Sequence, residues 1–116
     1  MKVAYEKVGD VLTVKVSGRV VGSDTLQFRR DVSGWIAEIP EAKKPKVVLV
    51  LDSVSMMDSA GMGALVSCFT FAQKREGRLV LAGLGRGVKN LIVQTKLSRV
   101  FEIYETEEEA IKSFET

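Results

Sequence analysis

The stretch KVVLVLDSVSMMDSAGMGALVSCFTF, residues 46–71, decides the fold of this chain. Near its start comes the run VVLVL, residues 47–51, whose apolar and mostly β-branched side chains are typical of a strand buried on both faces. Asp52 is expected to end this strand, and a short loop of serines and methionines follows. From about residue 60 to residue 75 the apolar residues recur at helical spacing. We therefore predict a strand, a loop and a helix at the centre of the protein, with polar residues at the start of the helix.

Strands and helices alternate on both sides of this stretch. Two short runs joined at Gly9-Asp10 predict a hairpin, which Gly18 is expected to close. Ser23 or Asp24 is a suitable N-cap for the amphipathic helix that follows. After the central helix we expect a strand, a glycine-rich loop, a helix, a short strand and a last helix. Since a hairpin is antiparallel, the sequence predicts an α/β fold with a mixed sheet of about four or five strands and about four helices.

Three local signals mark the second half of the chain. Gly77 is expected to supply the left-handed conformation that ends the central helix. Residues 100–104 are expected to form the last, short strand. Thr106, with Glu109 three residues later, predicts a capping box at the start of the last helix.

The composition argues against several classes of function. The chain has 116 residues, a formal net charge of +2, one cysteine and no histidine. Without histidine there is no Ser-His-Asp or Cys-His triad, and the usual zinc sites lack ligands. The small net charge does not favour nucleic acid, and no apolar run approaches the roughly 18 residues of a membrane span. The first residues also lack the apolar region of a signal peptide. We therefore expect a soluble, cytoplasmic, non-enzymatic domain over residues 1–116, with no cofactor, no metal, and no nucleic-acid or membrane partner.

A carboxylate and a hydroxyl stand where the central helix is expected to begin. Asp58 and Ser59 are both good N-cap residues, whereas Gly61 and Gly63 are poor helix formers. The two glycines keep side chains away from Ser59, so that another protein's active site could reach its hydroxyl. A phosphate on Ser59 would lie at the positive end of the helix dipole and would add negative charge beside Asp58. The same residues are also explained by simple capping and by close packing of the helix on the sheet.

The central helix offers a second candidate surface. Met62 and Leu65 share the face that is expected to pack on the sheet. Small or apolar residues lie near the opposite face, with Cys68 on its border: Ala60, Ala64, Ser67 and Phe71. Such a face beside Ser59 is a candidate docking patch for a partner. Coverage by another helix, or by a symmetric copy, is the alternative.

The central motif resembles the STAS domain family. The matching residues are Leu51-Asp52 and, after the short loop, Met57-Asp58-Ser59-Ala60-Gly61-Met62-Gly63. The resemblance covers nearly the whole chain in the order of its elements, and it is closest to the stand-alone bacterial anti-sigma-factor antagonists. It implies that Ser59 is phosphorylated by a partner that is both an anti-sigma factor and a serine kinase. It also implies that the unphosphorylated protein binds this partner, and that a PP2C-type phosphatase restores the bound state.

The resemblance and the helix pattern together give a set of expected site residues. Asp52 is expected to shape the loop and to bond its backbone, and the protein is expected to be a monomer or a weak dimer. The partner is expected to contact Asp58, Ser59, Ala60, Gly61, Met62, Gly63, Ser67 and Phe71.

The chain departs from the family pattern at two places. Arg19 follows Gly18, where the family often has an acidic residue that adjoins the kinase. Thr95-Lys96-Leu97 stands where a glycine commonly follows the third helix, which predicts a modified helix end. The first departure bears on the identity of the partner.

Two other functions remain open at this point. One is a STAS scaffold or accessory subunit of a signalling complex or an ABC lipid-transport system, in which Ser59 need not be modified. The other is a small nucleotide- or metal-dependent enzyme that uses Asp52, Asp58 and the glycine-rich loop at residues 83–87.

Overall fold

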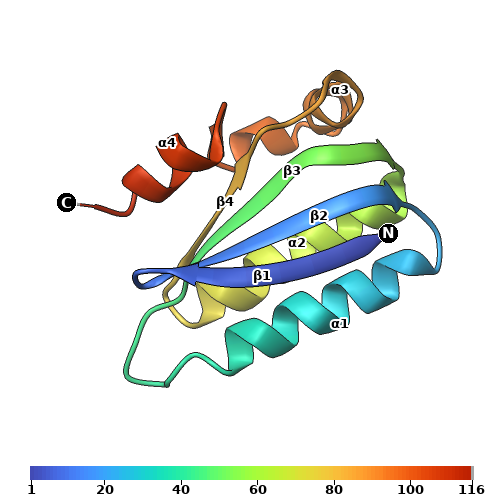
Figure 1. The fold of residues 1–116 in the computed structure, drawn as a ribbon. Coiled ribbons are helices and arrows are strands. Elements are labelled where there is room, and N and C mark those ends of the chain that lie inside the picture. Colours follow the sequence, from blue (N-terminus) through green and yellow to red (C-terminus); the bar gives the residue numbers. More distant parts are fainter. Residues whose placement is uncertain (116) are drawn as a thin grey trace.

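The computed structural model describes residues 1–115 and contains one five-stranded sheet (Figure 1). Its strands, which lie in sequence order across the sheet, are β1 Lys2–Val8, β2 Val11–Val20, β3 Lys46–Met57, β4 Arg78–Ala82 and β5 Ile103–Tyr104. Its helices are α1 Asp24–Ala37, α2 Ser59–Lys74, α3 Arg86–Gln94, the short 3₁₀ helix η1 Leu97–Arg99 and α4 Glu107–Lys112. Strands β1 and β2 are antiparallel, and every other neighbouring pair is parallel. The predicted α/β fold with a mixed sheet is thus confirmed.

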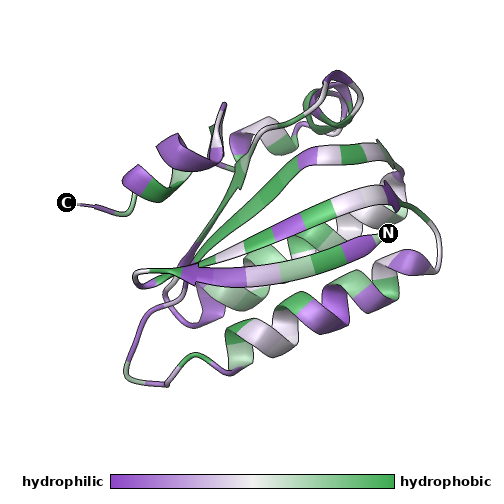
Figure 2. Ribbon diagram, in the orientation of Figure 1, coloured by the Kyte–Doolittle hydropathy of each residue, from purple (hydrophilic) through white to green (hydrophobic). Residues whose placement is uncertain are grey.

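The sheet separates two apolar cores. Alternate residues of β3 point to opposite faces, so Leu49 and Leu51 join one core and Val48 and Val50 join the other. The larger core also contains residues of α1, α2 and α3, whereas the smaller one contains Ala110 of α4. Crossover connections between parallel strands are almost always right-handed. When successive strands are added in one direction across a sheet, this handedness places the connecting helices on the same face of the sheet. Accordingly, α1 and α2 lie side by side and α4 lies apart from them (Figure 1). Strands β3 and β4 carry the most continuous hydrophobic runs (Figure 2).

The two central strands are longer than the sequence indicates. The prediction that Asp52 ends the third strand is wrong, because β3 continues to Met57. The pairing of the hairpin ends at Lys2 and Ser17, next to Gly18, as predicted, but β2 itself continues to Val20 along β3. The pairing of the two strands contains two register shifts, each with one extra residue on β3, and an extra residue of this kind bends the strand that carries it. The extensions of β2 and β3 have a polar composition that is typical of loops, because one face of this part of the sheet is largely exposed.

Among residues 1–115, two non-glycine residues adopt the left-handed conformation. Glu76, with φ 59°, provides the turn after α2 that was assigned to Gly77. Gly77 instead allows the backbone to pass close to Pro45, since a Cβ at position 77 would lie 2.8 Å from Cβ of Pro45. Lys96, with φ 62°, follows the end of α3, so the predicted modified helix end is confirmed.

The remaining helix ends differ in their caps. Thr106 caps α4, and its hydroxyl accepts a hydrogen bond from the Glu109 N–H at 3.1 Å, as the capping-box pattern predicts. Ser23 occupies the N-cap position of α1, but its side chain forms no capping hydrogen bond. The last strand is shorter than predicted, because the N–H groups of Val100 and Phe101 bond back to the Leu97 carbonyl at the end of η1, and the strand pairing with β4 is formed by Ile103–Tyr104.

Candidate functional site

Asp58 joins two segments that are far apart in the sequence. Its Oδ1 accepts a hydrogen bond from the Gly61 N–H at 2.9 Å and thereby caps α2. Its Oδ2 accepts a hydrogen bond from the Gly22 N–H at 3.0 Å, in the connection between β2 and α1. These backbone N–H groups, Gly61 first and then Gly22, lower the pKa of the Asp58 carboxyl below its ordinary value. The carboxylate is therefore ionised at neutral pH and fixed in orientation.

The neighbouring strand ends explain why this junction forms. Val20 and Met57 are partners in the parallel pairing of β2 with β3, so both strands end at the same place. Gly22 adopts a left-handed conformation with φ 54°, which favours glycine. At Gly61, a Cβ would lie 2.6 Å from the Val20 carbonyl oxygen and 2.5 Å from Cγ of Met57. The first turn of α2 thus packs directly on the ends of both strands.

Ser59 lies on the outside of this junction. It is the first residue of α2, its side chain is exposed, and its hydroxyl forms no hydrogen bond with any residue from 1 to 115. The N–H groups in the first turn of a helix lack intrahelical partners and carry the positive end of its dipole. The Ser59 hydroxyl is therefore accessible to another protein.

The two glycines of the first turn of α2 have different environments. Gly61 is buried, and the contacts of its backbone with Val20 and Met57 leave no room for a side chain. Gly63 is exposed, and a Cβ there would meet no atom of the described chain within 4 Å. Packing within the chain therefore accounts for Gly61 but not for Gly63.

The structure narrows the predicted partner surface. Ala60 and Gly63 are exposed beside Ser59, and Asp58 is half-buried. Met62 is only 3% exposed and belongs to the larger core, so its side chain supports the surface from below.

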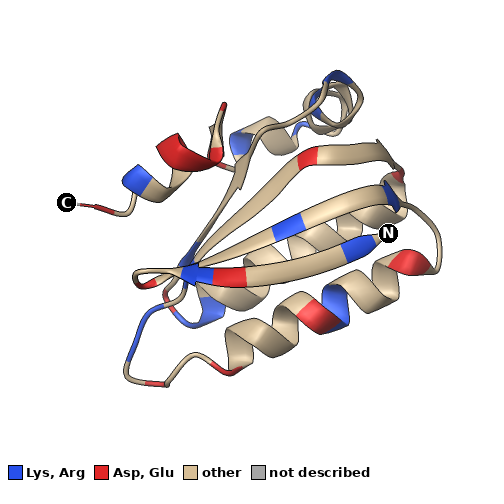
Figure 3. Cartoon of the chain, viewed as in Figure 1, with Lys and Arg blue, Asp and Glu red and all other residues tan. Residues whose placement is uncertain are grey.

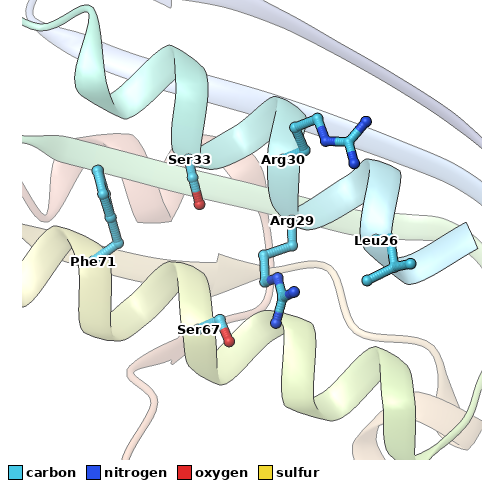
Figure 4. A pocket seen from close by; sticks show the side chains of 6 residues that line it. All are labelled: Leu26, Arg29, Arg30, Ser33, Ser67 and Phe71. Carbon is cyan, nitrogen blue, oxygen red and sulfur yellow. The ribbon is translucent and has the colours of Figure 1, made fainter.

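Helix α1 covers part of the predicted docking patch on α2. Ala64 and Cys68 are buried, and Cys68 faces Ser33 of α1, so a docking surface that includes them is wrong. Ser67 and Phe71 are half-buried and line a hollow of about 360 Å³ between the two helices (Figure 4). The α1 side of this hollow is lined by Leu26, Arg29, Arg30 and Ser33.

Asp52 lies outside the junction that Asp58 organises. Its side chain is exposed on β3, and within residues 1–115 its carboxylate accepts a hydrogen bond from the Ser53 hydroxyl at 3.4 Å and none from a loop backbone, so the expected backbone bond is wrong. A Cβ at Gly83 would lie 3.0 Å from Cβ of Asp52, so Asp52 packs closely against the connection from β4 to α3. Within residues 1–115, no three Asp, Glu, Cys or His side chains are placed to hold one metal ion. None of the helices in this range is both long and apolar enough to cross a membrane.

Sequence reasoning missed two contacts of the site. The Gly22 N–H that binds Asp58 comes from a segment 36 residues earlier, and the position of a glycine after a strand was its only local signal. Arg19 lies beside Met56 on the adjacent strand, with its Nη2 3.8 Å from the methionine sulfur. These two side chains extend the exposed surface along the ends of β2 and β3.

Comparison with known proteins assigns the chain to a family. The model of the STAS domain matches residues 2–110. The anti-sigma-B factor antagonist of Listeria monocytogenes is 40% identical over 68 residues, and this chain covers 60% of that protein's length. The match covers 57% of this chain. The anti-sigma F factor antagonist of Paenibacillus polymyxa is 23% identical over 117 residues, which cover 99% of this chain and 96% of the relative.

A solved structure shows the same fold. The anti-sigma factor antagonist SpoIIAA in its unphosphorylated form superposes with a TM-score of 0.80 at 22% identity, over 97% of this chain and 95% of that chain. The family model, which matches nearly all of the sequence, and this shared fold lead to one conclusion: the chain belongs to the STAS domain family.

Proposed function

We propose that this protein regulates transcription as an anti-sigma-factor antagonist that is switched by phosphorylation of Ser59. The unphosphorylated protein binds an anti-sigma factor through the exposed start of α2 and thereby frees the sigma factor. The observation that carries the proposal is the accessible hydroxyl of Ser59 next to a fixed carboxylate, with Gly63 exposed and not required by internal packing. Relatives named as antagonists of anti-sigma factors support the choice of partner.

Electrostatics provides the means of release. A phosphate on Ser59 adds about −1.5 to −2 charge at neutral pH beside the ionised Asp58. No cationic side chain within residues 1–115 forms an ion pair with Asp58. The start of α2 tolerates the phosphate because helix N-termini favour anions. A partner surface that fits the neutral serine is then repelled without unfolding of the protein.

The chemistry of the switch belongs to the partners. In the kinase step, the Ser59 oxygen attacks the γ-phosphorus of ATP, ADP leaves, and a base of the kinase accepts the hydroxyl proton. In the reverse step, a PP2C-type phosphatase transfers the phosphoryl group to water and regenerates the hydroxyl. Structures of SpoIIAA, which shares this fold, are described in both an unphosphorylated and a phosphorylated form, and this supports a phosphorylation switch here.

The test compares four baits in a pull-down from the source cells. They are the wild type, Ser59→Ala, Ser59→Asp and the matched control Thr70→Asp, an exposed position further along α2. Wild type, Ser59→Ala and Thr70→Asp should retain the same ATP-binding kinase, identified by mass spectrometry, whereas Ser59→Asp should lose it. Incubation of the isolated kinase with ATP should then add one phosphate to the wild type and to Thr70→Asp, but not to Ser59→Ala.

The opposite result would replace the proposal. If Ser59→Asp and the wild type retain the same transporter or signalling proteins, Ser59 is a helix-start residue in a scaffold or accessory subunit. Circular dichroism of all four baits separates loss of binding from loss of folding.

A further inference from the structure

The two edges of the sheet differ strongly. Strand β1 lies at one edge, contains seven residues, and pairs with β2 without a register shift. Strand β5 lies at the other edge and contains only two residues. Six of the seven residues of β1 are exposed, and the strand contains neither proline nor glycine. A long and regular edge presents unpaired N–H and C=O groups to any strand that can align with it, whereas a very short edge does not.

We propose that β1 is a dimerisation edge, at which a second copy of this chain adds its own β1 in the antiparallel direction. The twofold axis passes through Ala4, so that Ala4 lies opposite Ala4 of the partner subunit. The two five-stranded sheets then form one continuous sheet across the axis. This inference does not depend on Ser59 or on the proposed antagonist function.

The charges of β1 are self-complementary in this register. Lys2 lies opposite the partner's Glu6, and the twofold axis repeats the pair, giving two attractive contacts. Residues directly opposite each other in an antiparallel pair project to the same face, so the two charged groups meet. Glu6 can make this contact, since its side chain is 60% exposed and its ion pair within the chain is long, with Nζ of Lys15 4.0 Å from Oε1 of Glu6. Both signs of charge are present along β1 (Figure 3).

The apolar residues of β1 match in the same register. Val3 lies opposite the partner's Tyr5, on the face of the sheet that packs against α1. Tyr5 is 46% exposed and lies against Trp35 of α1, with ring centroids 4.6 Å apart. Val3 packs against the larger core. Pairing would therefore continue an apolar strip that already reaches the edge of the sheet.

Neighbouring registers fit less well. A shift by one residue places Lys2 opposite either Tyr5 or Lys7 of the partner subunit, and the second arrangement brings like charges together. A shift by two residues places Lys2 opposite either Ala4 or Val8 of the partner subunit. The register through Ala4 is thus the one that pairs opposite charges and joins apolar residues at the same time.

A charge exchange tests the interface. Sedimentation velocity of the untagged chain over a range of concentrations should show a weak, reversible dimer. Lys2→Glu replaces two attractive contacts with two repulsive ones and should weaken dimerisation by about tenfold or more. Glu6→Lys should do the same, and the double variant Lys2→Glu/Glu6→Lys should restore the dimer because it re-creates both pairs with their signs reversed.

Cross-linking tests the register. In Ala4→Cys, the two cysteines face each other with Cα atoms about 4.5–5.5 Å apart, a distance that a disulfide spans. Lys7→Cys is the matched control on the same strand, because the proposed register separates its two copies by roughly 20 Å along the strands. Mild oxidation should link Ala4→Cys and not Lys7→Cys. Cys68 should stay unreactive, because it is buried and burial raises the pKa of its thiol to about 12.

Several outcomes would overturn the proposal. One is a wild type that stays monomeric at the highest soluble concentration, which would leave the edge of β1 to a strand of another protein. Another is a dimer that the single charge variants do not weaken, or whose cysteines at position 7 link as readily as those at position 4. Circular dichroism spectra that match the wild type would show that the variants are folded.

Discussion

At the scale of single residues, Asp58 connects the fold with the proposed switch. Each of its two carboxylate oxygens accepts a backbone N–H, from Gly61 in α2 and from Gly22 before α1. A carboxylate held in this way orients the start of α2 and places a permanent negative charge beside Ser59. Charge and local geometry at the site therefore depend on the same side chain.

Asp58→Asn tests the charged form of this contact. Asparagine can cap a helix, but it has one acceptor oxygen and no charge. The Gly61 and Gly22 N–H groups lower the pKa of the Asp58 carboxyl in the folded state from about 3.8. Such a group stabilises the fold above its unfolded-state pKa and loses this contribution as the pH falls through its folded-state pKa. In urea unfolding, the wild type should therefore be more stable than the variant from about pH 7 to about pH 5, and this difference should shrink below about pH 3.8.

Asp24→Asn is the matched control for the loss of one carboxylate. Asp24 is exposed in the first turn of α1, and its carboxylate forms no hydrogen bond within residues 1–115. A difference for Asp58→Asn that persists unchanged in strong acid would show that the contact does not depend on ionisation.

At the scale of elements, the sequence predicts what depends on local pattern. The apolar run of β3, the start of α2 and the cap at Thr106 follow from neighbouring residues, and the structure confirms them. The extension of β3 to Met57 depends on pairing with β2, which no local pattern contains. The turn after α2 likewise depends on contacts with remote residues: Gly77 meets Pro45, and Arg75 donates to the Ile36 carbonyl at 2.7 Å.

The candidate functional site also combines features that neighbouring residues determine with features that depend on the packing of remote elements. The exposure of Ser59 and the capping by Asp58 follow from residues that are adjacent in sequence. The covering of Cys68 by α1 and the bond from Gly22 to Asp58 depend on how separate elements pack.

Replacing the two glycines of the first turn of α2 with alanine, one at a time, should change the stability of the protein in opposite directions. Gly61→Ala brings a Cβ to 2.6 Å from the Val20 carbonyl oxygen and should destabilise the protein by about 1–3 kcal/mol. Gly63→Ala places its Cβ in open space and should stabilise α2 by up to about 1 kcal/mol. Urea unfolding measures both changes. A partner that packs closely on Gly63 should bind Gly63→Ala more weakly, although the variant is more stable, and calorimetry would detect the weaker binding. Equal loss of stability in both variants would contradict the different environments of Gly61 and Gly63.

At the scale of the whole molecule, the two faces of the sheet are covered unequally. Helices α1, α2 and α3 contribute buried residues to the larger core, whereas α4 covers the other face with Ala110 as its one fully buried residue within the described range. Arg78 of β4 compensates for this small core. Its guanidinium binds both Glu102 oxygens, at 2.9 and 3.1 Å, and donates to the Ser113 carbonyl at 3.1 Å. It also lies 4.4 Å from the ring centre of Phe114.

Arg78→Ala should therefore release α4 without unfolding the rest of the protein. The lost contacts are partly exposed and together contribute about 1–2 kcal/mol, which corresponds to about tenfold faster amide exchange in residues 107–115. Amides of β3 and α2 should keep their wild-type rates, because their side chains belong mainly to the larger core. Arg99→Ala is the matched control, since the Arg99 side chain is exposed and forms no ion pair within residues 1–115. Arg78→Lys should lie in between, as lysine keeps the charge but cannot bind both Glu102 oxygens with the planar fork of arginine. Faster exchange throughout the sheet would show instead that α4 and the larger core unfold as one unit.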